Sequence, residues 1–489
     1  MLKTGDGLYK YKVTESLIMV FSSLVFLCIF LPIIFLAHSF VPSIRVKNIL
    51  LIIASLLFYS FGEPVYVILM VASALANYLC ALALGRFNRK VVVTIAVIIN
   101  IGVLCVFKYT GFIVETINAW SGADIPVPQI ALPVGISFFT FQALSYVIDV
   151  YRGNVDVQKN FAKVLLYISF FPQLIAGPIV KYRDIAKEID HRVISIREVA
   201  PGLRRFITGL GKKVIIANAM AVCADNIFSQ ELAQINIFGA WIGAIAYLMQ
   251  IYFDFSGYSD MAIGMGRMFG FHFKENFNFP YVALNIKDFW RRWHISLSSW
   301  FKEYVYIPLG GNRKGKPRTV INKLIVFFLT GLWHGANWTF VVWGMFHGAL
   351  NFLEEYVPGM RRLPKVIGHI YLIVAVTVGF VIFRADTISY GFGMVARMFS
   401  GFEFSNISMS VAVQQLTPQF IIMLIVAIIA CGPVGGLIIK LRETSDKSTF
   451  TKNESIVQVV TYIAAMVLLC WCIIRLSSGS YNPFIYFRF

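Results

Sequence analysis

The strongest candidate for chemistry in this sequence is a histidine in a glycine-containing break between two apolar segments. The break covers residues 330–339, with the sequence TGLWHGANWT, and it places His334 among apolar and aromatic residues. A buried imidazole that is neutral at neutral pH can accept a proton, so His334 is a candidate general base. The alternative is a structural histidine that hydrogen-bonds between helices, with His347 as its companion.

A second group of polar side chains follows the apolar run 237–251. Segment 252–260 has the sequence YFDFSGYSD, and it contains Asp254, Ser256 and Tyr258. Carboxylates at the end of a membrane helix are costly unless they are paired or line a wet cavity. These residues are therefore candidates for the lining of a substrate path. The alternative is an ordinary loop at the membrane interface.

The third candidate lies in segment 289–302, with the sequence FWRRWHISLSSWFK. Its tryptophans and cationic side chains suit the headgroup level, so an amphipathic interfacial helix explains them without any chemistry. His294 would then be one more interfacial residue. The spacing of His294, His334, His347 and Asp254 fits no compact metal motif, so we expect no metal site.

The composition determines which elements can position these residues. Of the 489 residues, 58% are hydrophobic and 14% are charged, against about 25% charged in an average soluble domain. This excludes a soluble enzyme, a secreted disulfide scaffold and a disordered chain. Since one spanning helix takes about 20 apolar residues, the chain is expected to be an all-α polytopic membrane protein with about twelve transmembrane helices.

The apolar runs give the expected spans, together with re-entrant and interfacial helices. A shorter run, 165–180, is interrupted by Pro172, Gly177 and Pro178, so we expect it to be re-entrant or half-spanning. The expected spans are 20–40, 49–61, 65–84, 91–107, 134–150, 206–223, 237–251, 324–333, 340–352, 366–383, 420–439 and 456–474.

The net charge of +18 is interpreted as membrane topology and contact with lipid headgroups, with no nucleic-acid partner. Loops rich and poor in basic residues alternate if the first span begins outside, which places the C-terminus outside. Lys3, Lys10 and Lys12 argue weakly against this orientation. We divide the chain into a polar N-terminal tail (1–18), a transmembrane domain (19–475) with a catalytic core at about 130–355, and an aromatic C-terminal tail (476–489).

Several motifs together are similar to those of a known family. The chain resembles the membrane-bound O-acyltransferase family, in the branch that contains bacterial alginate O-acetyltransferases. The resemblance implies a fold with a central funnel or tunnel and O-acyl transfer across the membrane. It maps the catalytic histidine onto His334 and the second signature histidine onto His294. The matching segments are 133–138, 149–153, 170–173, 176–179, 252–260, 290–299, 306–313 and 331–338.

The resemblance also implies the substrates. A cytoplasmic thioester, either acetyl-CoA or an acylated carrier protein, would donate the acyl group, and no cofactor would stay bound. Asn337 or His294 would hold the oxyanion or the thioester beside Trp333. Arg313 and Lys314 could receive donor phosphates, but a positive-inside cytoplasmic loop is the favoured explanation of these charges.

The implied setting is the bacterial inner membrane, with O-acetylation of an extracytoplasmic polysaccharide or cell-wall polymer. The longest loop assigned to the outside, 111–129, is too short to grip a polymer, so we expect dependence on a partner. The resemblance implies that this partner is an exported protein of the GDSL/SGNH hydrolase-like kind. A transporter or flippase for a polysaccharide or lipid-linked sugar is the main alternative. A scaffold for a cell-wall synthase complex is a third, in which His334 would be replaceable.

The C-terminal tail carries the last candidate. Its pattern of Phe484, Tyr486 and Phe489 resembles the C-terminus of small membrane proteins that work with this family in teichoic-acid D-alanylation. Tyr486 would be the first acyl acceptor, activated by His334. The pKa values of a thiol, near 8.5, and a phenol, near 10, imply that an aryl ester keeps most of a thioester's transfer potential. The alternative is an aromatic membrane anchor.

Overall fold

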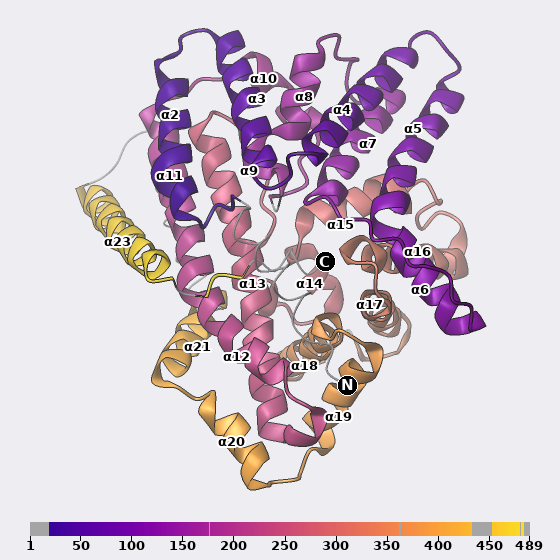
Figure 1. Ribbon diagram of the computed structural model, residues 1–489, viewed down its shortest axis with the longest axis vertical. Coiled ribbons are helices and arrows are strands. Elements are labelled where there is room, and N and C mark those ends of the chain that lie inside the picture. Colours follow the sequence, from indigo (N-terminus) through magenta and orange to yellow (C-terminus); the bar gives the residue numbers. More distant parts are fainter. Residues whose placement is uncertain (1–18, 176, 361–362, 433–451, 480, 484–489) are drawn as a thin grey trace. The chain divides into compact units, whose positions relative to one another are not determined.

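Every regular element that the structure describes is a helix, which confirms the expected all-α class (Figure 1). In this computed structural model the described residues are 19–175, 177–360, 363–432, 452–479 and 481–483. They form two compact units, 1–203 with 261–273 and 204–260 with 274–489. Helices α11 (Ile196–Gly211) and α13 (Ile237–Met268) contribute residues to both units. The expected N-terminal tail, 1–18, lies outside the described residues.

The first unit packs around α7 (Ile136–Arg152), which is buried along nearly its whole length. Gly135 and Gly153 flank this helix at φ 78° and 75°, conformations that glycine adopts without strain. Asn77 on α4 (Tyr66–Ala83) and Asn100 on α5 (Arg89–Leu104) exchange amide hydrogen bonds of 3.1 and 2.8 Å, so both buried amides have a partner. The elements of this unit before α11 are η1 (Phe26–Phe30), α2 (Leu31–Phe40), α3 (Ile44–Ser60), α4 (Tyr66–Ala83), α5 (Arg89–Leu104), η2 (Cys105–Tyr109), α6 (Thr110–Ser121), α7 (Ile136–Arg152), α8 (Phe161–Ser169), α9 (Phe171–Leu174) and α10 (Tyr182–Asp190).

The second unit contains the remaining helices. They are η3 (Lys212–Ala217), α12 (Asn218–Phe228), η4 (Leu232–Gln234), η5 (Pro280–Val282), α14 (Ile286–Arg292), α15 (Ile295–Phe301), η6 (Lys302–Tyr306), α16 (Gly315–His334), α17 (Trp338–Tyr356), α18 (Lys365–Arg384), α19 (Ile388–Ser400), α20 (Asn406–Gln414), α21 (Pro418–Cys431) and α23 (Lys452–Ser477).

Within the second unit, α16 and α17 pack side by side at very short range (Figure 1). A Cβ on Gly331 would lie 2.4 Å from the carbonyl oxygen of Phe340. A Cβ on Gly344 would lie 2.4 Å from the carbonyl oxygen of Phe327. Glycine at both positions therefore sets the distance between the helices that flank His334.

Six helical segments in the described part of the chain are long and apolar enough to cross a membrane, and the bent pair α20 and α21 makes up to seven. The chain is thus a multi-pass membrane protein, but the expected count of about twelve spans is not confirmed. The six segments are Tyr66–Ala83, Arg89–Ser121, Ile196–Phe228, Ile237–Met268, Lys365–Arg384 and Ile456–Ser477.

Three local expectations can be compared directly with the helices. Segment 252–260 lies inside α13, so the expected end of that helix at residue 251 and the alternative of an interfacial loop are both wrong. The segment 289–302 is not one amphipathic helix, because the chain breaks at His294 between α14 and α15. The expected interruption of 165–180 is confirmed, since α8 ends at Ser169 and α9 is a separate short helix.

Candidate active site

His334 is the last residue of α16 and lies in a cage of aromatic rings. Its ring centroid is 5.0 Å from those of Trp333 and Trp343 and 5.2 Å from that of Phe383. Only 7% of the residue is exposed. A Cβ on the next residue, Gly335, would lie 2.1 Å from the ring of Phe340, so a larger residue there would require this ring to move. The break at 330–339 therefore buries His334 among apolar rings, as expected.

His294 lies in the same cluster. Its ring centroid is 6.4 Å from that of His334, 5.7 Å from that of Trp333 and 4.6 Å from that of Phe255. The structure thus brings His294 next to the neighbouring residues Trp333 and His334, which lie about 40 positions further along the sequence. His294 is fully buried inside the protein, so its side chain does not face lipid or headgroups.

The electrostatic state of His294 follows from its surroundings. It lies between α14 and α15, outside the membrane-spanning segments, and burial lowers the pKa of its imidazole to about 3. His294 is therefore neutral at physiological pH. A neutral imidazole has one donor and one acceptor nitrogen, and its neighbours decide which is which.

Asn276 is a site residue that the sequence analysis missed. Its Oδ1 lies 3.2 Å from Nδ1 of His294, and it accepts hydrogen bonds from the amide of Ser296 at 3.1 Å and from the hydroxyl of Ser296 at 2.8 Å. The residue is fully buried. No sequence signal pointed to it, because a lone asparagine in a polar loop has many structural uses.

Asp254, Ser256 and Tyr258 are all buried on α13. Oδ1 of Asp254 lies 3.0 Å from Nζ of Lys213, and both side chains are 1% exposed. An ion pair therefore compensates the Asp254 charge, one of the two conditions under which such a residue is tolerated. Contact of these three residues with a substrate stays a prediction.

The sequence analysis did not single out Lys213, although a lysine inside the apolar run 206–223 is an unusual feature that could have indicated it.

Lys213 also holds the C-terminal segment. Its Nζ donates to the carbonyl oxygen of Pro483 and, at 3.0 Å, to Oδ1 of Asn218. Asn218 in turn donates to Oδ1 of Asn482 at 3.1 Å. Residues 482 and 483, within the C-terminal tail (476–489), are thus fixed to η3 and α12. Tyr486 lies outside the described residues.

A second anchor acts on the same segment. The hydroxyl of Tyr481 donates to Oδ2 of Asp225 at 2.7 Å, and Asp225 also pairs with Arg384 at the end of α18. The C-terminal segment is therefore held by side chains from two elements, η3 and α12, and Arg384 of α18 pairs with one of these side chains, Asp225.

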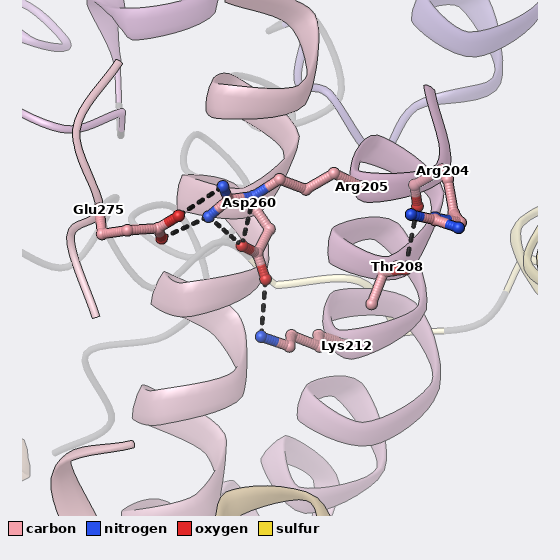
Figure 2. A network of polar contacts seen from close by, with 6 residues as sticks. All are labelled: Arg204, Arg205, Thr208, Lys212, Asp260 and Glu275. Carbon is pink, nitrogen blue, oxygen red and sulfur yellow. Dashed lines mark hydrogen bonds and ion pairs between the residues drawn. The ribbon is translucent and has the colours of Figure 1, made fainter. Parts of the chain in front are cut away.

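Asp260 organises a further charge network on α13 (Figure 2). Its carboxylate accepts from Arg205 at 2.8 and 3.0 Å and from Lys212 at 2.6 Å. Arg205 also binds Glu275 through two bonds of 2.6 and 2.5 Å. The network ties the segment that carries Asn276 to α11, η3 and α13.

Asn337 has a structural use. Its Oδ1 accepts from the amide of Thr339 at 3.0 Å and caps α17, while its Nδ2 donates to the carbonyl oxygen of Asp386 at 3.1 Å. Its expected contact with an oxyanion stays a prediction.

Arg313 and Lys314 are exposed before α16. This position is compatible with donor-phosphate binding and with a positive-inside loop. Among the described residues no group of three or more His, Cys, Asp or Glu side chains could hold a metal ion.

Comparisons with known proteins identify the family. The model of "MBOAT, membrane-bound O-acyltransferase family" matches residues 155–389. A protein of Azotobacter vinelandii named "Probable alginate O-acetylase AlgI" is 37% identical over 96% of this chain and 100% of its own. A peptidoglycan O-acetyltransferase of Helicobacter pylori is 37% identical, over 76% of this chain and 78% of its own. A teichoic acid D-alanyltransferase of Bacillus subtilis is 31% identical, over 51% of this chain and 67% of its own. Similarity over nearly the full length to a relative that is 37% identical, together with the family-model match, leads to one conclusion: the chain belongs to the membrane-bound O-acyltransferase family and is an O-acyltransferase.

Proposed function

We propose that this protein moves an acetyl group from a cytoplasmic thioester across the bacterial inner membrane, for O-acetylation of an extracytoplasmic polysaccharide or cell-wall polymer. The observation that carries the proposal is the burial of His334 beside His294, with ring centroids 6.4 Å apart. The relatives that match at 37% are named for O-acetylation, which favours acetyl over D-alanyl as the transferred group.

His334 is the general base in this proposal. Its neutral imidazole takes the proton of an acceptor hydroxyl while the oxygen attacks the thioester carbonyl carbon. The carbon–oxygen bond forms, the carbon–sulfur bond breaks, and the departing thiolate receives the proton from His334. General-base catalysis contributes about 10²- to 10⁴-fold to such a step.

The donor is acetyl-CoA or an acylated carrier protein, approaching from the cytoplasmic face. The exposed Arg313 and Lys314 can meet the phosphates that either donor carries. The first acceptor is Tyr486 on the C-terminal tail, which would lie on the outer side. The contacts of Lys213 with Pro483 and of Asn218 with Asn482 support this step, because they fix the chain a few residues before Tyr486.

The acetyl group then passes to the polymer through an exported partner of the GDSL/SGNH hydrolase-like kind. An aryl ester on Tyr486 retains enough transfer potential for passage to an aliphatic hydroxyl. Purified protein that acetylates the mature polymer at full rate without a partner would contradict this part of the proposal.

Membrane vesicles of defined orientation test the reaction and its direction. Inverted vesicles expose the cytoplasmic face, so labelled acetyl-CoA added outside should label the acceptor inside, and right-side-out vesicles should stay unlabelled. The variant His334→Gln should insert normally and lose about 10²- to 10⁴-fold in transfer.

The matched control is His369→Gln, because His369 is an exposed histidine on α18. It should transfer at the wild-type rate. Near-normal transfer by a folded His334→Gln protein would overturn the assignment of the base. Unchanged O-acetyl content with lost polymer export in His334→Gln cells would favour a transporter.

A further inference from the structure

We infer that Asn276 is a positioning residue that fixes the tautomer of His294, so that Nδ1 carries the proton and Nε2 faces the substrate as a hydrogen-bond acceptor. The inference rests on the proposed function, because it assigns a role to the second histidine of the same site. It also excludes His294, in its neutral form, as the donor that holds an oxyanion.

The first support is the backbone conformation of His294. Its φ is 44°, in the left-handed region that non-glycine residues adopt only when the surroundings require it. The amide of Ile295 donates to the carbonyl oxygen of Asn276 at 2.9 Å, and the amide of Ser296 donates to its Oδ1 at 3.1 Å. Asn276 therefore binds the two backbone amides that follow His294, one through its carbonyl oxygen and one through Oδ1. These two bonds fix the turn that directs the imidazole.

The second support is the set of hydrogens around the side chain of Asn276. A backbone amide can only donate, so the atom that faces the Ser296 amide must be the oxygen Oδ1. The single hydroxyl hydrogen of Ser296 goes to the same oxygen, at 2.8 Å, and not to the more distant Nδ1 of His294 at 3.5 Å. Nδ1 lies 3.2 Å from an oxygen that only accepts, so Nδ1 must donate to it.

Because Nδ1 carries the proton, Nε2 is the unprotonated nitrogen of the neutral ring and can only accept a hydrogen bond. Nε2 of His294 is buried and has no hydrogen-bond partner among the described residues. A buried acceptor without a partner is costly, so a substrate hydrogen is its natural complement. His334 takes the proton of the attacking hydroxyl in the proposed reaction. The hydrogen left for His294 is therefore an N–H of the thioester donor, whose pantetheine arm carries an amide near its sulfur.

The third support is the network that fixes Asn276 itself. The preceding residue, Glu275, binds Arg205 through two hydrogen bonds of 2.6 and 2.5 Å (Figure 2). Arg205 is held in turn by Asp260, which also binds Lys212 at 2.6 Å. The loop is thus tied to α11, η3 and α13 by charge-assisted bonds, which makes it a rigid support for the turn at His294.

The tautomer can be observed without any catalysis. The protein is labelled with ¹⁵N-histidine, placed in nanodiscs and examined by solid-state NMR, and the signals absent from His294→Asn are those of His294. We expect a protonated Nδ1 and a bare Nε2 in the wild type, and a mixture of tautomers in Asn276→Ala. The matched control is Asn285→Ala, which removes an asparagine cap from neighbouring α14 without contact with His294. Its His294 signals should match the wild type.

Kinetics test the consequence. Asn276→Ala should raise KM for the thioester donor about tenfold, as expected for one lost hydrogen bond, with a smaller change in kcat. Asn276→Asp should keep KM near the wild-type value, because a carboxylate accepts the same hydrogens. A donor analogue with an ester in place of the amide should bind the wild type about tenfold more weakly than acetyl-CoA does. It should bind Asn276→Ala no more weakly than acetyl-CoA binds the same variant.

A proton on Nε2 in the wild type, or an unchanged tautomer in Asn276→Ala, would overturn the inference. Equal KM values in Asn276→Ala and Asn276→Asp would also overturn it. Absence of acetyl transfer in the wild type would instead contradict the proposed function, because the NMR result does not depend on the reaction.

Discussion

Lys213 and Asp254 form an ion pair in which Nζ lies 3.0 Å from Oδ1 and both side chains are 1% exposed. The same ammonium group donates to the carbonyl oxygen of Pro483 and to Asn218. One buried pair therefore connects η3, α13 and the C-terminal segment. Asp254 directly precedes Phe255, whose ring is 4.6 Å from that of His294, so this anchor lies close to the candidate site along α13.

The first prediction concerns this pair. Asp254→Leu should lower the free energy of unfolding by about 3–5 kcal/mol, because it leaves the Lys213 charge buried without its carboxylate. The double variant Lys213→Met with Asp254→Leu should recover most of that loss, since two apolar side chains replace two charges. Thermal unfolding in nanodiscs measures both effects.

A surface pair provides the control for this prediction. Glu403 is bound to Arg397 at 2.9 Å, but its side chain is 75% exposed. Glu403→Gln should change stability by no more than about 1 kcal/mol. A double variant as unstable as Asp254→Leu alone would show that the charges contribute more than mutual compensation, for example by holding the C-terminal segment.

The second prediction concerns the contact between α16 and α17. Gly331→Ala should destabilise the protein by about 1–3 kcal/mol or more, because the new Cβ would meet backbone and not a flexible side chain. The nearest atom would be the carbonyl oxygen of Phe340 at 2.4 Å. Transfer activity should fall as well, since α16 carries His334. Thermal unfolding and acetyl transfer are measured on the same preparation.

Gly102→Ala on α5 is the matched control for the glycine substitution. A Cβ at Gly102 would have no heavy atom within 4 Å. Alanine is favoured over glycine in a helix by about 0.5–1 kcal/mol, so this variant should be as stable as the wild type or slightly more stable. Equal stability of Gly331→Ala and the wild type would mean that the two helices can separate without cost.

The third prediction is a pH dependence of stability in the first unit. Nδ1 of His272 lies 2.8 Å from Glu188, and Nε2 lies 3.3 Å from Glu198. The hydrogen bond with Glu188, followed by the other interactions with the two carboxylates, raises the pKa of His272 above 6.5 even though partial burial opposes the shift. A raised folded-state pKa stabilises the protein fully below the unfolded pKa, and this contribution is lost as pH rises through the folded value.

Thermal unfolding of wild type and His272→Gln checks the sign. The difference in Tm should be largest at about pH 6 and should shrink at alkaline pH, where His272 is neutral in both states. His369→Gln should show no such trend, because His369 contacts only a backbone carbonyl group in its described interactions. A difference that grows with rising pH would contradict the prediction.

The sequence indicated the helical class and the site around His334 because both depend on local patterns. Long apolar runs predict helices, and the glycines of 330–339 mark the break that places His334 beside Trp333. The extent of α13 was not predictable in this way. Asp254 and Asp260 look like the start of a polar loop, but inside α13 they are paired with Lys213, Arg205 and Lys212, which lie far from them in the sequence.

The contact between Asn276 and His294 was also not predictable from the sequence, because it again joins residues that are distant along the chain. Asn276 is 18 positions away in the sequence, and its hydrogen bond to the imidazole forms only when the loop folds back on α15. The left-handed conformation of His294 was equally hidden, because glycine and asparagine are the usual signals for it and histidine is not. Contacts between distant residues, and strain that they impose, are the part of this site that requires a structure.

The last prediction concerns Tyr486, which lies outside the described residues. Pro483 is held by Lys213, and three residues of extended chain span at most about 11 Å, so the reach of the Tyr486 backbone from this anchor is limited. Tyr486→Phe keeps the aromatic ring and removes only the hydroxyl that would accept the acetyl group. Polymer O-acetylation should be lost, while thermal stability and membrane insertion should match the wild type.

The control is the double variant Phe484→Tyr with Tyr486→Phe, which keeps the number of tyrosines but places the hydroxyl at position 484. It should not restore acetylation. Unchanged polymer acetylation in Tyr486→Phe would mean that the tail only anchors the chain, and that the acetyl group leaves the site of His334 by direct transfer to another acceptor.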